Sequence, residues 1–196
     1  MDASSNWVPF GHVDRFAPPE LRSWLAEPGL LTARIRDLCG ERLRFRMLGP
    51  LRRAPLAPDT RARLEVADTH CWLREIEFRC DDARLVYAQT VLPESTVGCC
   101  PWLRELGDAP IGEALRRSAD PVEREPLEYA ALRPDDVLAQ AAASDAGAEA
   151  APATLWARRA VYRLSAHRPI LVQEVFLPAL LRVRPDRAAP SEGAAR

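Results

Sequence analysis

Two stretches of alternating apolar and polar residues dominate the sequence and predict its central strands. In residues 69–80 the even positions from 72 onward are apolar except for one cation, Arg74. In residues 169–178 the even positions are apolar except for one carboxylate, Glu174. A period of two is typical of β-strands, because successive side chains point to opposite faces of a sheet. Each strand therefore places a single charge in an apolar row.

These two opposite charges allow two interpretations. An arginine keeps its charge in a dry interior, where the lack of an anionic partner is costly. Either Arg74 and Glu174 form a structural ion pair, or they line a pocket for a small molecule with a carboxylate at one end and a polar group at the other. Periodicity alone slightly favours the ion pair, because neither strand by itself indicates a cavity.

The remaining pattern predicts helices first and a partner strand beside each of the two central strands. We expect one helix opened by Pro18–Pro19 and ended by Pro28–Gly29, and a second from Leu30 to Gly40. Shorter helices are expected at residues 102–107 and from residue 111. Strands are expected at 42–48, 85–92 and 156–164, with an extended segment at 122–132 and an irregular, proline-rich segment at 49–58.

This order of elements predicts an α+β fold. We expect a single domain whose antiparallel sheet carries helices packed on one face, with the other face in solvent. The expected organisation is an N-terminal arm at 1–18, a domain at 19–184 with a surface insertion at 139–153, and a disordered tail at 185–196. A length of 196 residues suits one domain with a substantial core.

Composition narrows the classes of function. The net charge of -1 removes any general electrostatic reason to expect binding to nucleic acid or to an anionic membrane. No apolar run is long enough to span a bilayer, and the polar N-terminus is unlike a signal peptide. The five cysteines are odd in number and lack CxxC spacing, which indicates a reducing compartment. We therefore expect a cytoplasmic protein.

Other residues with catalytic chemistry give no competing site. Cys99 and Cys100 are adjacent, but no histidine or further cysteine lies near them at ligand spacing, so no metal site is expected. The three histidines, His12, His70 and His167, stand in no triad-like setting. The helix that begins at residue 111 would offer free backbone N–H groups to an anion, although an ordinary connection between two helices has the same pattern.

Several segments, in the right order, resemble the chorismate pyruvate-lyase family. These are Trp24–Leu25, residues 30–34, residues 72–76, residues 106–112, residues 155–159 and residues 174–178. The resemblance implies a chorismate lyase-like α+β fold and the conversion of chorismate to 4-hydroxybenzoate and pyruvate, the first committed step toward ubiquinone. The ring becomes aromatic in this reaction, which makes it strongly downhill, so we expect no metal, flavin or nucleotide cofactor.

The same resemblance implies four site residues. Arg74 would bind the ring carboxylate, with a backbone contact from Ile111, and Glu174 would meet the ring hydroxyl. Leu31 would line the site. Leu31 and Ile111 differ from the residues associated with these positions in the family, but both keep apolar bulk, and a main-chain amide is indifferent to the exchange.

Some questions stay open at this point. The alternation of the strand places Arg158 and Arg159 on opposite faces, and one of them meets the second carboxylate of the substrate or both lie at the surface. The competing class is a non-catalytic effector-sensing domain, which would bind a small carboxylate without turning it over and would follow a DNA-binding helix-turn-helix domain. Barely twenty residues precede the first expected helix, which favours the enzyme. We expect chorismate as the small-molecule partner, and a monomer.

Overall fold

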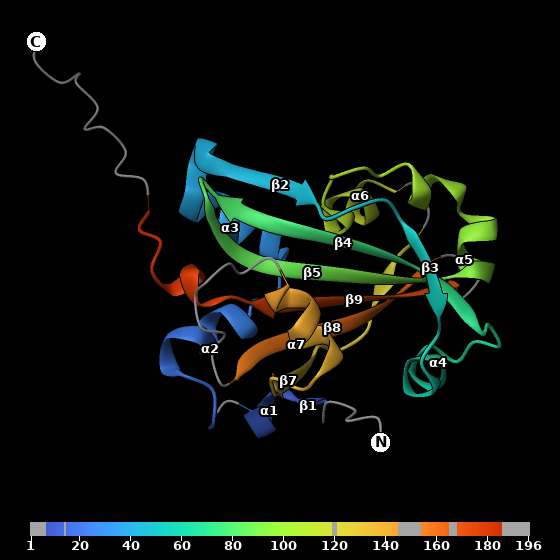
Figure 1. The fold of residues 1–196 in the computed structure, drawn as a ribbon, viewed down its shortest axis with the longest axis horizontal. Helices are drawn as coiled ribbons and strands as arrows, with labels where there is room; N and C mark the ends of the chain where they lie inside the picture. Colours follow the sequence, from blue (N-terminus) through green and yellow to red (C-terminus); the bar gives the residue numbers. More distant parts are fainter. Residues whose placement is uncertain (1–6, 14, 119–120, 145–153, 165–167, 186–196) are drawn as a thin grey trace, which may run out of the picture.

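A computed structural model describes residues 7–13, 15–118, 121–144, 154–164 and 168–185, and these form one antiparallel sheet with helices on both of its faces (Figure 1). The nine-stranded sheet has the order β1-β7-β8-β9-β5-β4-β2, with β3 paired to β4 and β6 paired to β8. The strands are β1 (Val8–Pro9), β2 (Leu43–Met47), β3 (Arg52–Pro55), β4 (His70–Cys80), β5 (Ala83–Pro93), β6 (Glu123–Arg124), β7 (Glu128–Leu132), β8 (Leu155–Leu164) and β9 (Arg168–Phe176).

Two hairpins meet at the centre of the sheet. The first joins β4 to β5 and the second joins β8 to β9, as the alternating sequence patterns predict. The hairpins are linked by antiparallel pairing of β5 with β9, in which Ala88 is opposite Glu174 and Thr90 is opposite Val172. Since Thr90 is also opposite Arg74, this register brings the two predicted charged residues onto one face of the sheet, two strands apart.

The helices are short and lie mostly between strands. They are α1 (Phe10–Val13), α2 (Pro19–Leu25), α3 (Leu31–Cys39), α4 (Pro58–Leu64), α5 (Glu94–Cys99), α6 (Ile111–Arg117) and α7 (Val137–Ala143), with 3-10 turns η1 (Gly40–Arg42), η2 (Pro101–Arg104) and η4 (Pro178–Leu181). The expected helices at α2, α3 and α6 are confirmed. The segment expected at 102–107 is the shorter turn η2, and α4 and α5 were not predicted.

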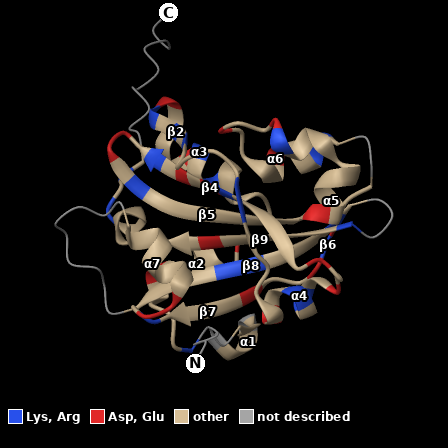
Figure 2. Ribbon diagram, turned by 45° about the vertical axis from the view of Figure 1, so that its right-hand side comes forward, with Lys and Arg blue, Asp and Glu red and all other residues tan. Residues whose placement is uncertain are grey.

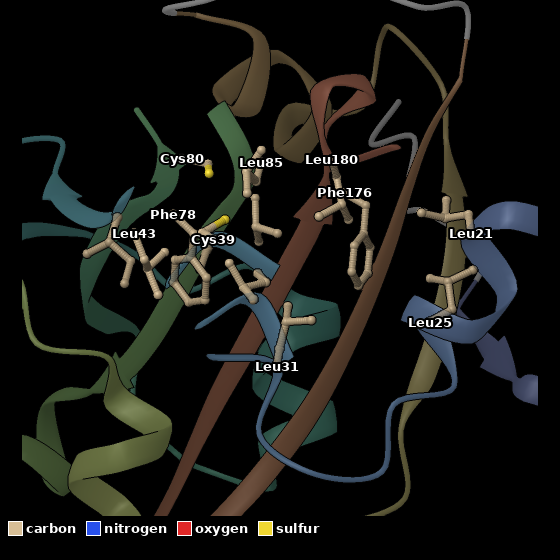
Figure 3. Packing of buried hydrophobic residues seen from close by; sticks show 14 of the residues in the cluster. Leu21, Leu25, Leu31, Cys39, Leu43, Phe78, Cys80, Leu85, Phe176 and Leu180 are labelled. Atoms are coloured by element: carbon tan, nitrogen blue, oxygen red, sulfur yellow. The ribbon is translucent and has the colours of Figure 1, made fainter. Parts of the chain in front are cut away.

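The first face of the sheet carries the main hydrophobic core. Leu21 and Leu25 of α2 lie on one side of Phe176, and Leu43 and Phe78 lie on the other (Figure 3). Leucine and phenylalanine side chains buried in this way each contribute about 1.5–3 kcal/mol of hydrophobic stabilisation. The face is built from the even positions of β4, β5 and β9, in agreement with the predicted period of two.

The second face of the sheet is not left to solvent, and that part of the prediction is wrong. Leu64 of α4 packs with Cys71, Val91 and Leu171. Residues of α7, including Ala142, form a further cluster with Tyr87, Val175 and neighbouring strand residues. Helix α7 crosses in front of the sheet in Figure 1, and α3 lies behind it. The α+β class, the antiparallel sheet and the single domain are confirmed, but helices cover both faces.

The burial of the second face was not predicted because that face contains a charged residue. The Glu77 side chain is fully buried, and its carboxylate accepts hydrogen bonds from Arg46 at 3.2 Å, from Arg79 at 2.9 Å and from Arg84. From the sequence, a glutamate at an odd position of β4 indicates a face in contact with solvent. Here three guanidinium groups neutralise the Glu77 carboxylate, so this face can pack inside the protein.

Parts of two expected segments, the N-terminal arm and the surface insertion, belong to a strand and a helix. Val8–Pro9, within the expected arm, pairs with β7 at the edge of the sheet. Residues 139–143, within the expected insertion, belong to α7, and Ala139 and Ala142 are buried. In the proline-rich segment, Arg52–Pro55 pairs with β4 as β3. Residues 145–153 and 186–196 lie outside the described residues, so the rest of the insertion and nearly all of the tail stay predictions.

Candidate functional site

A small pocket lies on the first face of the sheet, where the two hairpins meet. It encloses about 30 Å³ of free space between the strands and two covering segments, residues 29–32 and 110–112. The four residues predicted from the sequence, Leu31, Arg74, Ile111 and Glu174, all line it. The other lining residues are Gly29, Leu30, Thr32, Ile76, Phe78, Ala88, Thr90, Pro110, Gly112, Arg158, Tyr162 and Val172.

Arg74 is held by backbone carbonyls and has unused donors. Its side chain is among the largest that are fully buried, at 1% exposure. Its Nη2 donates to the carbonyl oxygens of Gly107 at 2.8 Å and Ala109 at 2.6 Å. Its Nε and Nη1 are buried and, among the described residues, have no hydrogen-bond partner. Buried donors are rarely left in this state, so these two nitrogens call for an acceptor from outside the chain.

The charge of Arg74 persists despite its surroundings. Burial lowers the pKa of Arg74 to about 10, and the nearby Asp108 carboxylate acts in the opposite direction. A guanidinium with this pKa stays protonated at neutral pH. The pocket therefore contains a fixed positive charge with free N–H groups, which suits the carboxylate of a small ligand.

The predicted alternative of a structural ion pair between Arg74 and Glu174 is wrong. Glu174 instead accepts a hydrogen bond from Nε of Arg158, its neighbour across the β8–β9 pair, with Nε and Oε2 2.5 Å apart. Figure 2 shows the positively charged part of β8 beside the acidic part of β9. Glu174 is thus already neutralised, and it leaves Arg74 to another anion.

Arg158 and Arg159 point to opposite faces of the sheet, as their alternation predicts. Arg158 is 2% exposed and lines the pocket. Arg159 lies on the second face, where its Nε donates to Glu128 at 2.8 Å and its guanidinium stacks 4.5 Å from the ring centre of Trp7. Sequence reasoning left the roles of these two residues open, and the structure places only Arg158 at the site.

The two covering segments are helix starts. Leu31 is the first residue of α3 and Ile111 the first residue of α6, and both side chains are buried. Backbone amides in a first helical turn have no acceptor within the helix, so the Ile111 amide is available to a ligand. The segments approach closely, because a Cβ added at Gly112 would lie 3.1 Å from Cδ2 of Leu30.

Three polar lining residues were not singled out from the sequence. Thr32 and Thr90 are buried at 4% and 2% exposure, and Tyr162 is half-buried. Burial raises the pKa of Tyr162, an effect that the Glu174 carboxylate reinforces. The positions of Thr90 and Tyr162 follow from the alternation of β5 and β8, which gives a signal that could have identified them. Nothing in the periodicity distinguishes Thr32.

The site is organised around one cation and one ion pair rather than a metal-binding set. Among the described residues no group of three histidine, cysteine or carboxylate side chains could hold a metal ion. His12 is exposed, His70 is half-buried beside Thr69, and His167 lies outside the described residues. In the part of the chain that the structure describes, no helix is long and apolar enough to cross a membrane.

Comparison with known proteins defines the class of protein and then the family. The fold is shared with domains of transcription regulators. One is the C-terminal domain of the histidine utilization repressor from Pseudomonas syringae pv. tomato, which has a TM-score of 0.50 and 9% identity, with 76% of this chain and 100% of that chain covered. At that identity the likeness shows the fold alone. The sequence profile of the chorismate lyase family matches residues 2–184, and the chain belongs to this family.

Curated relatives agree with that assignment. A protein from Azoarcus sp. named "Probable chorismate pyruvate-lyase" is 40% identical over 179 residues, covering 88% of this chain and 91% of its own. A protein of the same name from Aromatoleum aromaticum is 38% identical over 169 residues, covering 85% and 89%. The resemblance on which the four site residues depend is therefore confirmed at the level of the family.

Proposed function

We propose that this protein is a chorismate pyruvate-lyase that converts chorismate to 4-hydroxybenzoate and pyruvate, for ubiquinone biosynthesis. The observation that carries the proposal is Arg74, a fully buried cation with two unsatisfied nitrogen donors in a pocket that also contains the Arg158–Glu174 pair. A ligand with a carboxylate at one end and a hydroxyl at the other matches this arrangement. The names of the relatives support the choice of chorismate.

The reaction is an elimination. The ether bond between the ring and the enolpyruvyl group breaks, and its electrons leave with the enolpyruvyl oxygen. The ring carbon that carries the hydroxyl loses its hydrogen as a proton, and the ring becomes aromatic. Protonation of the methylene carbon of the released enolate gives pyruvate, so the proton lost from the ring is balanced by the one gained. Atoms and charge balance without an oxidant or a reductant, so we propose that no cofactor takes part.

The residues of the pocket supply binding, orientation and exclusion of water. Arg74 holds the ring carboxylate with charge-assisted hydrogen bonds, and the Ile111 amide adds a backbone donor. Glu174 accepts a hydrogen bond from the ring hydroxyl. Leu31 and the other apolar lining residues keep water from the ring, which strengthens each of these contacts. Productive orientation of the enolpyruvyl arm then accounts for much of the rate enhancement.

The pocket must widen to admit a substrate. A free volume of about 30 Å³ accommodates water molecules but no aromatic ring. The covering segment at residues 29–32 follows a loop after α2, whereas the floor belongs to four hydrogen-bonded strands. We propose that this segment moves, while the strands and the loop held by Arg74 keep their positions.

The test is direct. Purified protein is mixed with chorismate in the presence of EDTA and without any nucleotide, and 4-hydroxybenzoate and pyruvate are quantified. Equal amounts of both products are expected. If neither product forms but 4-hydroxybenzoate raises the melting temperature, the chain is a binding domain rather than an enzyme. If there is neither turnover nor binding, the pocket assignment fails as well.

The proposal also covers the cellular compartment and the oligomeric state of the protein. The five cysteines are free, which fits a reducing compartment such as the cytoplasm. We propose that the protein works there as a monomer, because Arg74, Glu174 and Arg158 all come from one chain. Size-exclusion chromatography with light scattering checks the oligomeric state.

A further inference from the structure

The Arg158–Glu174 pair has a geometry that goes beyond charge neutralisation. Arg158 contacts Oε2 of Glu174 through its Nε, at 2.5 Å, and both residues belong to the paired strands β8 and β9. The two side chains are 3% and 16% exposed. One carboxylate oxygen of Glu174 is therefore engaged, and its Oε1 is the one left to accept a hydrogen bond inside the pocket.

Arg158 is itself held at its other end. Its Nη1 donates to the carbonyl oxygen of Glu27 at 2.9 Å and lies 3.4 Å from that of Leu25, the last residue of α2. Carbonyl groups at the end of a helix lack intrahelical donors and carry partial negative charge. The guanidinium thus spans from the end of α2 to the carboxylate of Glu174. A planar group that is fixed at both ends has little freedom to rotate.

We propose that Arg158 is a positioning residue, which holds the Glu174 carboxylate turned so that a single oxygen faces the ring hydroxyl of the ligand. This inference rests on the proposed function and adds a residue to it. A carboxylate free to rotate would present either oxygen, or neither, to the ligand.

The other groups near Glu174 leave the positioning role to Arg158. Tyr162 of β8 lines the same pocket, and Arg124 of β6 acts to lower the pKa of Tyr162. Arg74 of β4 faces the pocket two strands away. Of these groups, Arg158 alone donates a hydrogen bond to Glu174 in the described structure. The apolar Phe176, whose ring centre is 5.8 Å from the Arg158 guanidinium carbon, offers no replacement.

Binding of two matched ligands separates positioning from support of the fold. 4-Hydroxybenzoate and benzoate differ only in the hydroxyl that is proposed to donate a hydrogen bond to Glu174. A hydrogen bond to a charged group contributes roughly 1.5–3 kcal/mol, so the wild-type protein should bind 4-hydroxybenzoate at least about 10-fold more tightly than benzoate. In Arg158→Gln this preference should fall below about threefold, with the affinity for benzoate changed by less than about threefold.

The matched control is Arg159→Gln, which removes the adjacent arginine and its contact with Glu128 on the second face. It should keep the wild-type preference for 4-hydroxybenzoate. Turnover of chorismate gives a second readout: kcat should fall in Arg158→Gln and stay at the wild-type value in Arg159→Gln. A loss of support for the fold would weaken both ligands equally.

Two further variants keep the test decisive if Arg158→Gln does not fold. Arg158→Lys retains the charge but cannot reach both the α2 carbonyls and Glu174 with a planar fork. It should show a weakened preference for the hydroxyl. The double variant Arg158→Lys/Glu174→Gln should prefer 4-hydroxybenzoate over benzoate no less than Glu174→Gln alone does. The reason is that both residues act on the same hydrogen bond to the ring hydroxyl.

The outcomes distinguish this inference from the proposed function. A wild-type protein that neither turns over chorismate nor binds 4-hydroxybenzoate overturns the proposed function. An active wild-type protein whose Arg158 variants keep the full preference for 4-hydroxybenzoate overturns the positioning role and leaves the lyase assignment intact. Equal weakening of both ligands in the folded variants also overturns it.

Discussion

Nη2 of Arg74 lies 2.8 Å from the carbonyl oxygen of Gly107, which ties the loop before α6 to the strand that carries the buried cation. The same nitrogen donates to the carbonyl oxygen of Ala109, so Arg74 holds the loop on both sides of Asp108. Helix α6 begins two residues later at Ile111. The backbone amide and the guanidinium proposed to share one carboxylate are thus fixed relative to each other.

Arg74→Met should remove turnover and keep the fold. Methionine fills a similar apolar volume, and the native structure no longer has to bury an unpaired charge, so the melting temperature should be equal or higher. The substrate carboxylate, in contrast, would enter a dry pocket without its partner, a loss of about 3–5 kcal/mol that lowers kcat/KM at least about 100-fold. Steady-state kinetics and thermal unfolding measure the two effects. Arg44→Met, at an exposed position of β2, is the control.

Gly107→Ala should weaken the hydrogen bonds between Arg74 and the loop before α6. Gly107 has a φ of +55°, and a Cβ there meets no atom within 4 Å, so the cost is one of backbone conformation alone. That cost is about 1–2 kcal/mol for a non-glycine residue. We expect lower stability and a raised KM for chorismate. Gly98→Ala, in α5 with equally open surroundings but no positive φ, should leave KM unchanged; a KM raised as much in Gly98→Ala would contradict the prediction.

Glu77→Gln should destabilise the protein without touching the chemistry. Glu77 is fully buried on the second face and accepts hydrogen bonds from Arg46, Arg79 and Arg84. Removal of one partner from a buried charge network costs about 3 kcal/mol, and urea denaturation measures the change. Asp135→Asn, which alters an exposed ion pair, should cost less than about 1 kcal/mol. Unaltered kcat in the folded fraction of both variants is expected.

Acid stability should depend on Glu75. Burial acts to raise the pKa of Glu75, but hydrogen bonds from Tyr87, Arg52 and Gln89 outweigh it and hold the pKa below its usual value. The stabilisation is therefore fully present above the unfolded-state value of about 4.3 and is lost as the pH falls through the lower folded-state value. The free energy of unfolding of wild type and Glu75→Gln should differ at pH 7 and converge below about pH 4. A constant gap from pH 7 to pH 3 would rule this out.

The charged residues of the site could be predicted because each interrupts an apolar row. Arg74 and Glu174 stand out in period-two patterns, and their strands are confirmed. The partner of Glu174 could not be predicted, because alternation assigns Arg158 to a face but does not give the register between β8 and β9. Which charges meet across a sheet is decided by tertiary pairing.

The cover of the second face was missed for reasons of composition. In α4 only Leu64 is a large apolar residue, so residues 58–64 show no amphipathic stripe, although Pro58 at the helix start is a favourable signal. In α7 the buried residues include Ala139 and Ala142, small side chains that resemble those of a surface segment. Burial of Glu77 required three arginines from β2, β4 and β5, a set that no local pattern reveals.

The pairing of β5 with β9 has a consequence for how the protein is made. Arg74 arrives with the first hairpin, whereas Arg158 and Glu174 arrive with the last two strands of the sheet. Contacts between segments so far apart in sequence form slowly, since a large loop must close before they contribute. A nascent chain that stops before β9 carries Arg74 but lacks Glu174 and half of the pocket. Activity should therefore begin only after β9 has been made, and no fragment that lacks β9 should retain any of it.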